Sequence, residues 1–279
     1  LEAELKATSD LVSHVKSLNN PGIKPAIAPH APYTVPPGHL EICAEYSENE
    51  KIIIHTHLAE TKQEVDDCQK AHGMTPAALL DKAGCLTKRT VAAHGCWLSE
   101  EDCRLLGERG SFIVHNPVSN MKLATGRAMP YHWLMEQGAN VCLGTDGCSS
   151  NNNLDMYEEM KTAALCQKFY WNSDTVLPAA EALSMGTSRG SAALGYHGGE
   201  IKEGMPADIV LISLKHPSMV PLHNPVSNIV YSANGSAVDT VICQGKILMY
   251  NSYIPDEEEI IAGASGSAGD LLQRAGTGA

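Results

Sequence analysis

Five short apolar stretches, each ending in a polar or ionisable residue, constrain the fold of this chain most. They span residues 26–30, 52–57, 91–94, 111–116 and 141–146. Near-continuous apolar runs without strict alternation are typical of parallel strands that are covered on both faces. Helical patterns are expected at 37–48, 62–82, 99–109, 127–138 and 154–169. Because strand and helix alternate, the sequence predicts a parallel α/β sheet, either doubly wound or closed into a barrel.

The ends of these stretches favour the barrel. The polar residues at or near the ends are His30, His57, His94, His115 and Asp146. In a barrel the carboxyl ends of the strands converge on one rim, whereas a doubly wound sheet would spread them along an edge. We therefore predict a TIM-type (β/α) barrel that is incomplete, with about five of the eight strands of a closed one.

Changes of composition divide the chain into three regions. Residues 1–200 form the barrel portion, and we expect a helix from Leu1 to Leu18 with Leu11 and Val15 on its apolar face. After residue 200, β-rich pieces at 209–214 and 238–250 flank a turn at Gln244, which predicts a small β-sandwich part over residues 201–255. Residues 256–279 end in a stretch rich in Gly, Ala and Ser, which indicates a flexible tail.

Composition excludes two classes of partner. Acidic residues outnumber basic ones by 32 to 20 and no run of Lys and Arg occurs, so no basic stripe for nucleic acid is expected. No apolar stretch approaches the roughly 20 residues that span a bilayer, so we expect no membrane partner. The nine cysteines are odd in number and contain no CxxC, a pattern that favours reduced thiols and a cytoplasmic protein.

The segment His55-Thr56-His57-Leu58-Ala59-Glu60 is a candidate metal and proton-transfer site. The two histidines are two residues apart and share one face of the strand, about 6.6 Å apart along it. Such a pair can bind one metal if the strand bends, so spacing alone leaves the choice open. In the functional interpretation His57 is a ligand and Glu60 carries a proton to the substrate. The alternative is a core histidine beside a surface glutamate.

Asp146, His94 and His115 are further candidates, each with a structural alternative. Asp146 ends a strand before a turn rich in Gly and Asn, where a carboxylate can contact a metal and accept a proton from its water. It could equally be a turn or helix-capping residue. His94 and His115 could be buried structural histidines. The hexapeptide His-Asn-Pro-Val-Ser-Asn occurs at 115–120 and at 223–228 with different flanks, and only the first copy, which follows a strand, is a site candidate.

These motifs together resemble the amidohydrolase superfamily, in particular the branch that includes the 5-methylthioadenosine/S-adenosylhomocysteine deaminases. The motifs are APHAPYT at 28–34, HTHLAET at 55–61, AAHGCWLSEED at 92–102, HNPVSNMKLATG at 115–126, LGTDGCSSNNNLDM at 143–156 and GEIKEGMPADIVLI at 199–212. They occur in the order of the family and cover the chain from residue 26 to about 250. The resemblance implies a TIM-type barrel, a β-sandwich and one divalent metal, with zinc expected and iron as the alternative.

The resemblance also implies roles for individual residues. His57 would be a metal ligand, and Asp146 a metal ligand and proton acceptor that also lies against the substrate. Glu60 would contact the substrate and protonate its ring nitrogen, and His94 would act on the attacking water or the tetrahedral centre. His30 would contact the nucleoside. His55 does not match a ligand position of the family.

The chain departs from the family pattern at its start. The family's first barrel strand carries another HxH pair that supplies two metal ligands, and no such pair stands before residue 26. We therefore expect a fragment that lacks roughly the first third of the family pattern.

The predicted function is metal-dependent hydrolytic deamination of an adenine nucleoside, methylthioadenosine or S-adenosylhomocysteine, to the inosyl product and ammonia. The alternatives are another amidohydrolase activity, of the triazine chlorohydrolase, guanine deaminase or cytosine deaminase type, or an inactive fragment. The only partners expected are the small nucleoside and, in a homo-oligomer, further copies of the chain.

Overall fold

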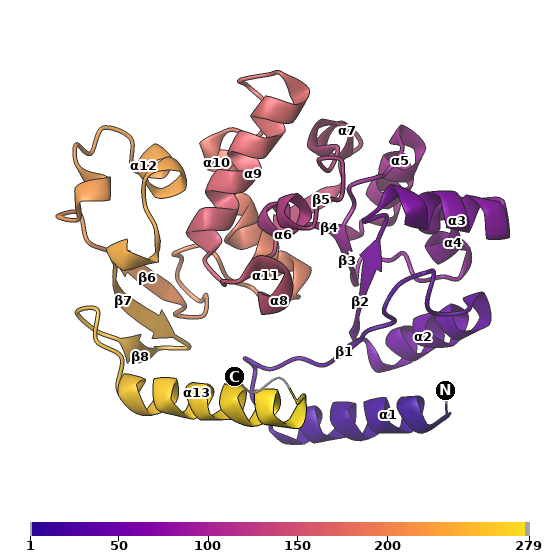
Figure 1. Ribbon diagram of the computed structural model, residues 1–279, viewed down its shortest axis with the longest axis horizontal. Coiled ribbons are helices and arrows are strands. Elements are labelled where there is room, and N and C mark those ends of the chain that lie inside the picture. Colours follow the sequence, from indigo (N-terminus) through magenta and orange to yellow (C-terminus); the bar gives the residue numbers. More distant parts are fainter. Residues whose placement is uncertain (1, 277–279) are drawn as a thin grey trace.

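A five-stranded parallel sheet forms the centre of the computed structural model, which describes residues 2–276 (Figure 1). Its strands lie side by side in chain order: β1 (Ala26–Ile27), β2 (Ile53–Leu58), β3 (Thr90–His94), β4 (Phe112–His115) and β5 (Asn140–Leu143). All four pairings are parallel. The predicted α/β class and the five predicted strands are confirmed, and β1 and β5 form the two edges of the described sheet.

Helices follow or connect the strands. They are α1 (Glu2–Ser17), α2 (Pro37–Glu50), α3 (Lys62–His72), α4 (Pro76–Lys82), α5 (Glu100–Arg109), α6 (Pro117–Lys122), α7 (Tyr131–Glu136), α8 (Cys148–Asn151), α9 (Met156–Trp171), α10 (Ala179–Met185) and α11 (Ser188–Ala193). Helix α1 was predicted, but Leu11 is exposed and Val12 is the residue it buries. Leu1, where that predicted helix starts, lies outside the described residues.

Two helix predictions were wrong in extent. The segment predicted as one helix at 62–82 is two helices, because Gly73 takes the left-handed conformation that ends α3, with φ 68°. Thr75 then caps α4 by accepting a hydrogen bond from the backbone N–H of Ala78. The helix predicted at 127–138 begins only at Tyr131, since Pro130 disfavours helical backbone in the residue before it.

The two faces of the sheet are buried to different degrees. On β2, Ile54, Thr56 and Leu58 are buried on the face that packs against the helices. The other face carries Ile53, His55 and His57, which are partly or fully exposed. On the neighbouring strands this second face packs in a small cluster with Ala193 of α11: Val91, Val114 and Cys142. The histidines of β2 therefore lie on the less buried face of that strand.

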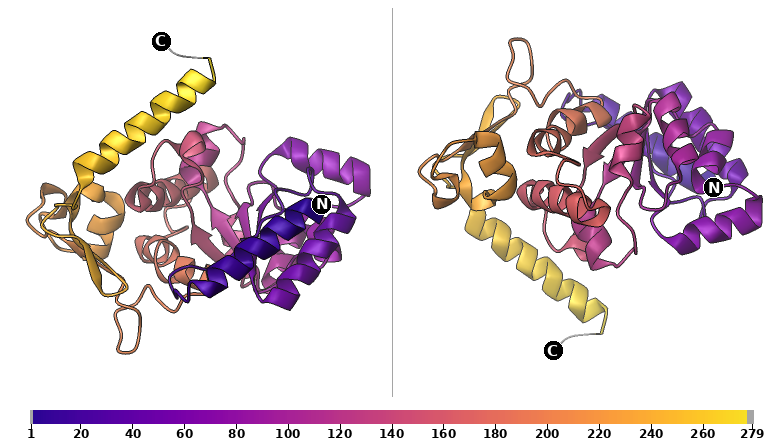
Figure 2. Two further views of the ribbon diagram at one scale, coloured as in Figure 1. Left: turned by 90° about the horizontal axis from the view of Figure 1, so that it is seen from below. Right: turned by 90° about the horizontal axis from the view of Figure 1, so that it is seen from above.

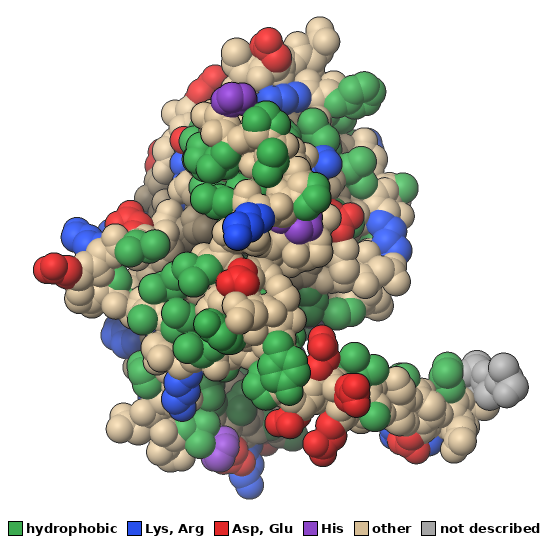
Figure 3. Space-filling model, turned by 90° about the vertical axis from the view of Figure 1, so that its left-hand side faces the viewer, with side chains coloured by type: hydrophobic (Ala, Val, Ile, Leu, Met, Phe, Trp, Pro, Cys, Tyr) green, Lys and Arg blue, Asp and Glu red, His purple; other side chains and the backbone are tan. Residues whose placement is uncertain are grey.

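The C-terminal part contains a second, antiparallel sheet of three strands, β6 (Ile209–Ile212), β7 (Val238–Cys243) and β8 (Lys246–Met249). Gln244 and Gly245 make the predicted turn, both with positive φ, as a tight hairpin requires. The small β part was predicted, but the sequence did not indicate the short helices η1 (Pro217–Met219), α12 (Pro225–Tyr231) and η2 (Gly235–Ala237) between β6 and β7. Exposed apolar side chains of this part include Val210, Leu211, Ile247 and Leu248 (Figure 3).

The tail predicted to be flexible over 256–279 is mostly a helix, α13 (Glu257–Arg274). It extends away from the rest of the chain and buries no residue (Figure 2). Three glutamates in its first turn complement the positive end of the helix dipole, which favours a helix at this composition. Residues 277–279 of the predicted tail lie outside the described residues. Within residues 2–276, no helix combines the length and apolarity needed to cross a bilayer.

Candidate active site

Four of the predicted site residues meet beyond the carboxyl ends of β2, β3 and β5. The rings of His57 and His94 are stacked, with centroids 5.4 Å apart and planes inclined by 16°. Nε2 of His94 lies 3.8 Å from a carboxylate oxygen of Glu60. The nearby His94 and His57 are among the groups that lower the pKa of Asp146, so its carboxylate lies close to both rings.

The tautomer of His57 is fixed by the segment that follows β1. Its Nδ1 lies 2.6 Å from the backbone oxygen of His30, and its backbone N–H donates to the same oxygen. Because a carbonyl oxygen only accepts, Nδ1 of His57 must carry the proton. In the neutral ring Nε2 carries the free lone pair, and a backbone partner on the opposite nitrogen is the usual support of a metal-binding histidine.

His30 and His55 border this centre. The His30 ring is exposed, contacts the His57 ring at 4.8 Å between centroids, and pairs through Nδ1 with the Thr34 hydroxyl at 2.9 Å. His55 lies on the same face of β2 as His57 and is exposed. Within the described residues no hydrogen bond joins His55 to Glu60 or Asp146. That His57, and not His55, is the metal ligand stays a prediction.

His94 has an unusual backbone conformation that places its ring in the site. By strand alternation its side chain would lie on the helix-covered face, with Leu58, its partner in the register. Its φ of 77° is rare for a residue with a Cβ and turns the ring toward His57 instead. The side chain is almost completely buried, and burial lowers the pKa of His94 although the charges of Glu60 and Asp146 oppose this. His94 is therefore a neutral imidazole.

Asp146 is held as a carboxylate by two hydrogen bonds. The Ser119 hydroxyl donates to Oδ2 at 2.6 Å and the Gly147 backbone N–H donates to Oδ1 at 2.7 Å. Burial alone raises the pKa of Asp146, but these hydrogen bonds and the neighbouring His94 and His57 outweigh it and lower the pKa. Its φ of 61° again marks a strained residue at the end of a strand.

Glu64 positions the backbone of Glu60, a relationship that the sequence did not reveal. The two carboxylate oxygens of Glu64 accept hydrogen bonds from the backbone N–H groups of Ala59 and Glu60, each at 2.8 Å. The Glu64 side chain is buried and Ala59 has a φ of 48°. The only signal in the sequence was the spacing Thr61-x-x-Glu64, which is typical of a helix start and not of an active site.

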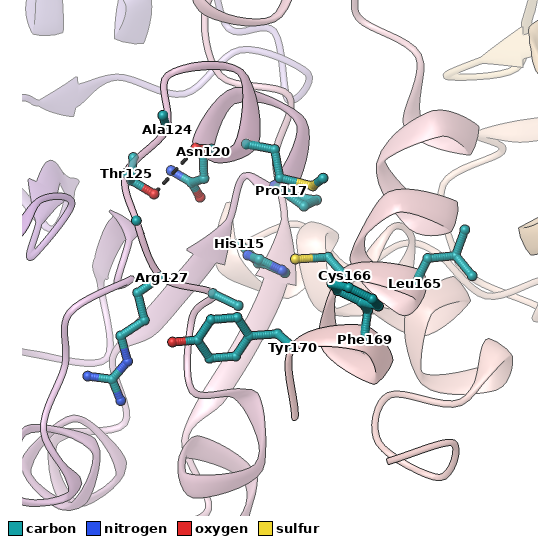
Figure 4. A pocket seen from close by; sticks show the side chains of 13 residues that line it. His115, Pro117, Asn120, Ala124, Thr125, Arg127, Leu165, Cys166, Phe169 and Tyr170 are labelled. Atoms are coloured by element: carbon teal, nitrogen blue, oxygen red, sulfur yellow. Dashed lines mark hydrogen bonds between the residues drawn. The ribbon is translucent and has the colours of Figure 1, made fainter. Parts of the chain in front are cut away.

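His115 lies in the core and supports the structural alternative. Burial lowers the pKa of His115 to about 3, and its Nε2 lies 3.2 Å from the amide nitrogen of Gln167. Beside it is an open, largely apolar cavity of about 670 Å³ between α6 and α9. Figure 4 shows Asn120 and Thr125 on one side of this cavity and Leu165 and Phe169 on the other. Of the candidate site residues, none of His57, Glu60, His94 and Asp146 lines this cavity.

The residues present supply part of a metal site. Imidazole nitrogen and carboxylate oxygen are both zinc ligands, which fits Nε2 of His57 and the carboxylate of Asp146. A catalytic zinc usually takes three ligands from protein. Among the described residues, no group of three or more His, Cys, Asp or Glu is arranged to hold a metal ion. The donor set is thus chemically suitable but incomplete.

Comparison with known proteins agrees with the fold. The chain is 83% identical over 276 residues to a 5'-deoxyadenosine deaminase of Methanospirillum hungatei. It is 43% identical over 259 residues to a 5-methylthioadenosine/S-adenosylhomocysteine deaminase of Archaeoglobus fulgidus. These matches cover 99% and 93% of this chain but only 62% and 61% of the relatives, so the chain spans about three fifths of their length.

A solved structure matches over almost the whole chain. The crystal structure of an adenosine deaminase from Xanthomonas campestris with bound zinc superimposes with a TM-score of 0.91 at 34% identity. The match covers 97% of this chain and 62% of that one. The model of the amidohydrolase family matches residues 2–248. This chain therefore belongs to the amidohydrolase family.

Proposed function

We propose that this chain carries the proton-transfer part of the active site of a deaminase that converts an adenine nucleoside to the inosine-type nucleoside and ammonia. One observation carries the proposal: the Glu60 carboxyl group and the neutral His94 ring lie side by side next to His57. Replacing an amino group on a ring carbon requires a proton donor to the ring nitrogen and a donor to the new oxygen. Glu60 and His94 meet these two needs.

The remaining steps use the other residues of the site. Asp146, held ionised, accepts the proton of the attacking water. Glu60 protonates N1 of the purine, which makes C6 electrophilic, and His94 donates a hydrogen bond to the oxygen that develops there. His30, exposed beside His57, contacts the sugar side of the nucleoside. The proton that Asp146 took from water passes to the amino group, which leaves as ammonia when the C6–N6 bond breaks. The proton of the new hydroxyl group passes to Glu60 as the carbonyl forms, which restores both carboxyl groups.

A divalent metal, zinc in our proposal, would be held by Nε2 of His57 and by Asp146 from this chain together with ligands from outside the described residues. When bound, the metal supplies Lewis-acid chemistry that makes water a stronger nucleophile at neutral pH. The zinc named with the Xanthomonas campestris structure supports zinc over iron.

We favour 5'-deoxyadenosine as the substrate over methylthioadenosine and S-adenosylhomocysteine, which the sequence motifs first indicated. The support is the 83% identity to the Methanospirillum hungatei 5'-deoxyadenosine deaminase, against 43% to the relative that is named for the two thioethers. Crystal structures of an atrazine chlorohydrolase from Arthrobacter aurescens also match, at 24% identity. This likeness supports the shared fold but does not support a triazine as the substrate.

The test measures ammonia release and the absorbance change from adenine to hypoxanthine with zinc present. The substrates are 5'-deoxyadenosine, methylthioadenosine, S-adenosylhomocysteine and adenosine. Two proteins are compared: this chain alone, and this chain joined to the part of the Methanospirillum hungatei relative that it does not match. We expect the joined protein to deaminate 5'-deoxyadenosine with the highest kcat/KM. Zinc-loaded joined protein that deaminates none of the four would refute the proposal.

A further inference from the structure

The hexapeptide His-Asn-Pro-Val-Ser-Asn occurs twice in the chain with the same local structure, so its two copies can be compared. At 115–120 and at 223–228 an Asn takes the N-cap position and a Pro begins a short helix, α6 or α12. The surroundings differ. In the first copy Ser119 and Asn120 are buried, whereas Ser227 and Asn228 are partly exposed. Any property that only the first copy has comes from its place after β4, not from its local sequence.

Only the first copy contacts the candidate site. Ser119 donates to Asp146, and the side-chain amide nitrogen of Asn120 lies 2.9 Å from Nδ1 of His94. In the second copy, Asn228 donates instead to the backbone oxygens of Ser218 and Pro221. Two adjacent residues of α6 therefore hold the side chains at the ends of β3 and β5.

The position of Asn120 is fixed by burial and by its backbone, whereas its side-chain amide could take either of two orientations. The residue is 6% exposed, and its backbone oxygen accepts a hydrogen bond from the backbone N–H of Thr125 at 3.1 Å. With its amide nitrogen toward His94, its amide oxygen has no partner among the described residues. The reverse orientation would instead point the amide oxygen at Nδ1 of His94. The proton of the ring decides between the two.

The surroundings of Nε2, on the other side of the His94 ring, indicate which nitrogen carries the proton. Nε2 faces the carboxyl group of Glu60, which only accepts when it is ionised. A proton on Nε2 is attracted by that carboxylate, and Nδ1 then has a lone pair that only a donor can satisfy. The amide nitrogen of Asn120 is that donor. His94 and His57 thus take opposite tautomers, since His57 carries its proton on Nδ1.

We propose that Asn120 is a positioning residue that holds neutral His94 with its proton on Nε2, so that this N–H points into the candidate active site as a hydrogen-bond donor. The proton position follows from the contacts of Asn120 and Glu60, whereas its catalytic consequence rests on the proposed deaminase function. A His94 with the opposite tautomer would present a lone pair to the developing oxygen and repel it.

The first test reads the proton directly by NMR of the 279-residue chain labelled with ¹⁵N-histidine. Comparison with His94→Gln identifies the His94 signals among the 12 histidines. We expect protonated Nε2 and unprotonated Nδ1 at neutral pH. In Asn120→Asp, which has the same shape but only accepts, Nδ1 becomes protonated. Asn228→Asp, the same change in the second copy, leaves the His94 signals in place.

The second test measures kinetics of the zinc-loaded joined protein. Asn120→Leu keeps the side-chain volume but removes the donor, and the adjoining cavity leaves room for it. We expect kcat to fall about tenfold or more with a smaller change in KM, because the lost interaction acts in the transition state. Asn228→Leu serves as the control and keeps the wild-type kcat.

The outcomes separate the two proposals. A wild-type His94 protonated on Nδ1 would overturn the assignment of Asn120, whether or not the protein is active, and needs no variant to fold. An unchanged kcat in Asn120→Leu would overturn its positioning role. If the NMR result holds but no nucleoside is deaminated, the proton assignment stands and the proposed function fails.

Discussion

The Ser119 hydroxyl lies 2.6 Å from Oδ2 of Asp146, so a residue of α6 stabilises the carboxylate that follows β5. Removing this hydrogen bond in Ser119→Ala leaves a partly buried charge with one donor fewer. Hydrogen bonds to charged groups contribute on the order of 2 kcal/mol, so we expect the free energy of unfolding to fall by about that amount. Urea unfolding of the metal-free chain measures it.

Ser227→Ala is the matched control for this prediction. Ser227 has the same position in the second copy of the hexapeptide, and its hydroxyl makes no hydrogen bond within the part of the chain that the structure describes. Its change should alter the unfolding free energy by less than about 0.5 kcal/mol. Equal losses in the two variants would show that the Asp146 contact contributes nothing.

Glu60→Gln tests the proton carrier. The amide keeps the shape of the side chain but does not donate an acidic proton, so the joined, zinc-loaded protein should lose at least about 10²-fold in kcat. Zinc content, measured by elemental analysis, should stay at the wild-type level because Glu60 is not a proposed ligand. Turnover equal to that of the wild type would contradict the assigned role.

His57→Asn should weaken zinc binding more than His55→Asn. In the neutral ring of His57 the Nε2 lone pair is available because Nδ1 donates to the backbone oxygen of His30. His55 is exposed on β2 and has no such backbone partner within residues 2–276. Competition with a chromophoric chelator measures the zinc affinity of the joined protein and of each variant. Similar losses in the two variants would refute the choice of His57 as the ligand.

Glu159 should make stability depend on pH. It is completely buried on α9, and burial raises its pKa from 4.5 to about 7, although hydrogen bonds from Asn151 and from the Val118 backbone oppose the shift. Between these two pH values the folded chain keeps a proton that the unfolded chain has released. The stabilisation is therefore complete below about pH 4.5 and is lost as the pH rises through about 7.

The matching experiment compares unfolding free energies at about pH 5 and about pH 8. Glu159→Gln mimics the protonated form, so its unfolding free energy should fall less than that of the wild type over this interval. The difference between the two falls should be at most about 3 kcal/mol. Glu158→Gln, an exposed neighbour, should behave like the wild type. A Glu159→Gln variant with the same pH profile as the wild type would disprove the shift.

Gly144 precedes Asp146 where the backbone passes close to β4. A Cβ at this position would lie 2.6 Å from Cγ1 of Val114, so Gly144→Ala must displace the end of β5. Overpacking of this kind costs about 1–3 kcal/mol of unfolding free energy. At Gly147 a Cβ meets nothing within 4 Å, so Gly147→Ala should cost less than about 0.5 kcal/mol. Thermal unfolding of both variants decides whether the close approach matters.

The sequence predicted those features that depend on burial along a single strand. The apolar runs before His57 and Asp146 had to be buried, and parallel strands bring their carboxyl ends to one side, so strand number and the location of the candidate site followed. The contributions of Asn120 and Glu64 could not be predicted in this way, because each acts on a residue that another segment supplies.

Local composition was a poor guide where backbone geometry or helix propensity decided the structure. His94 and Asp146 have positive φ although neither is glycine, and a positive φ at such residues cannot be predicted from the residue type. The glycines of α13 suggested a flexible tail, yet its alanines, leucines and first-turn glutamates form a helix, and none of its residues is buried. Gly73 and Pro76, in contrast, were visible stop and start signals within the segment predicted as one helix.

The duplicated hexapeptide gives the chain a built-in reporter of its folded state. An antibody raised against His-Asn-Pro-Val-Ser-Asn would find its epitope at 223–228, where the first residues are exposed, but not at 115–120, where nearly every residue is buried. Unfolding would uncover the second epitope and double the number of antibodies bound by each chain. Binding stoichiometry alone would then count the unfolded molecules in a mixture, without a label or an enzyme assay.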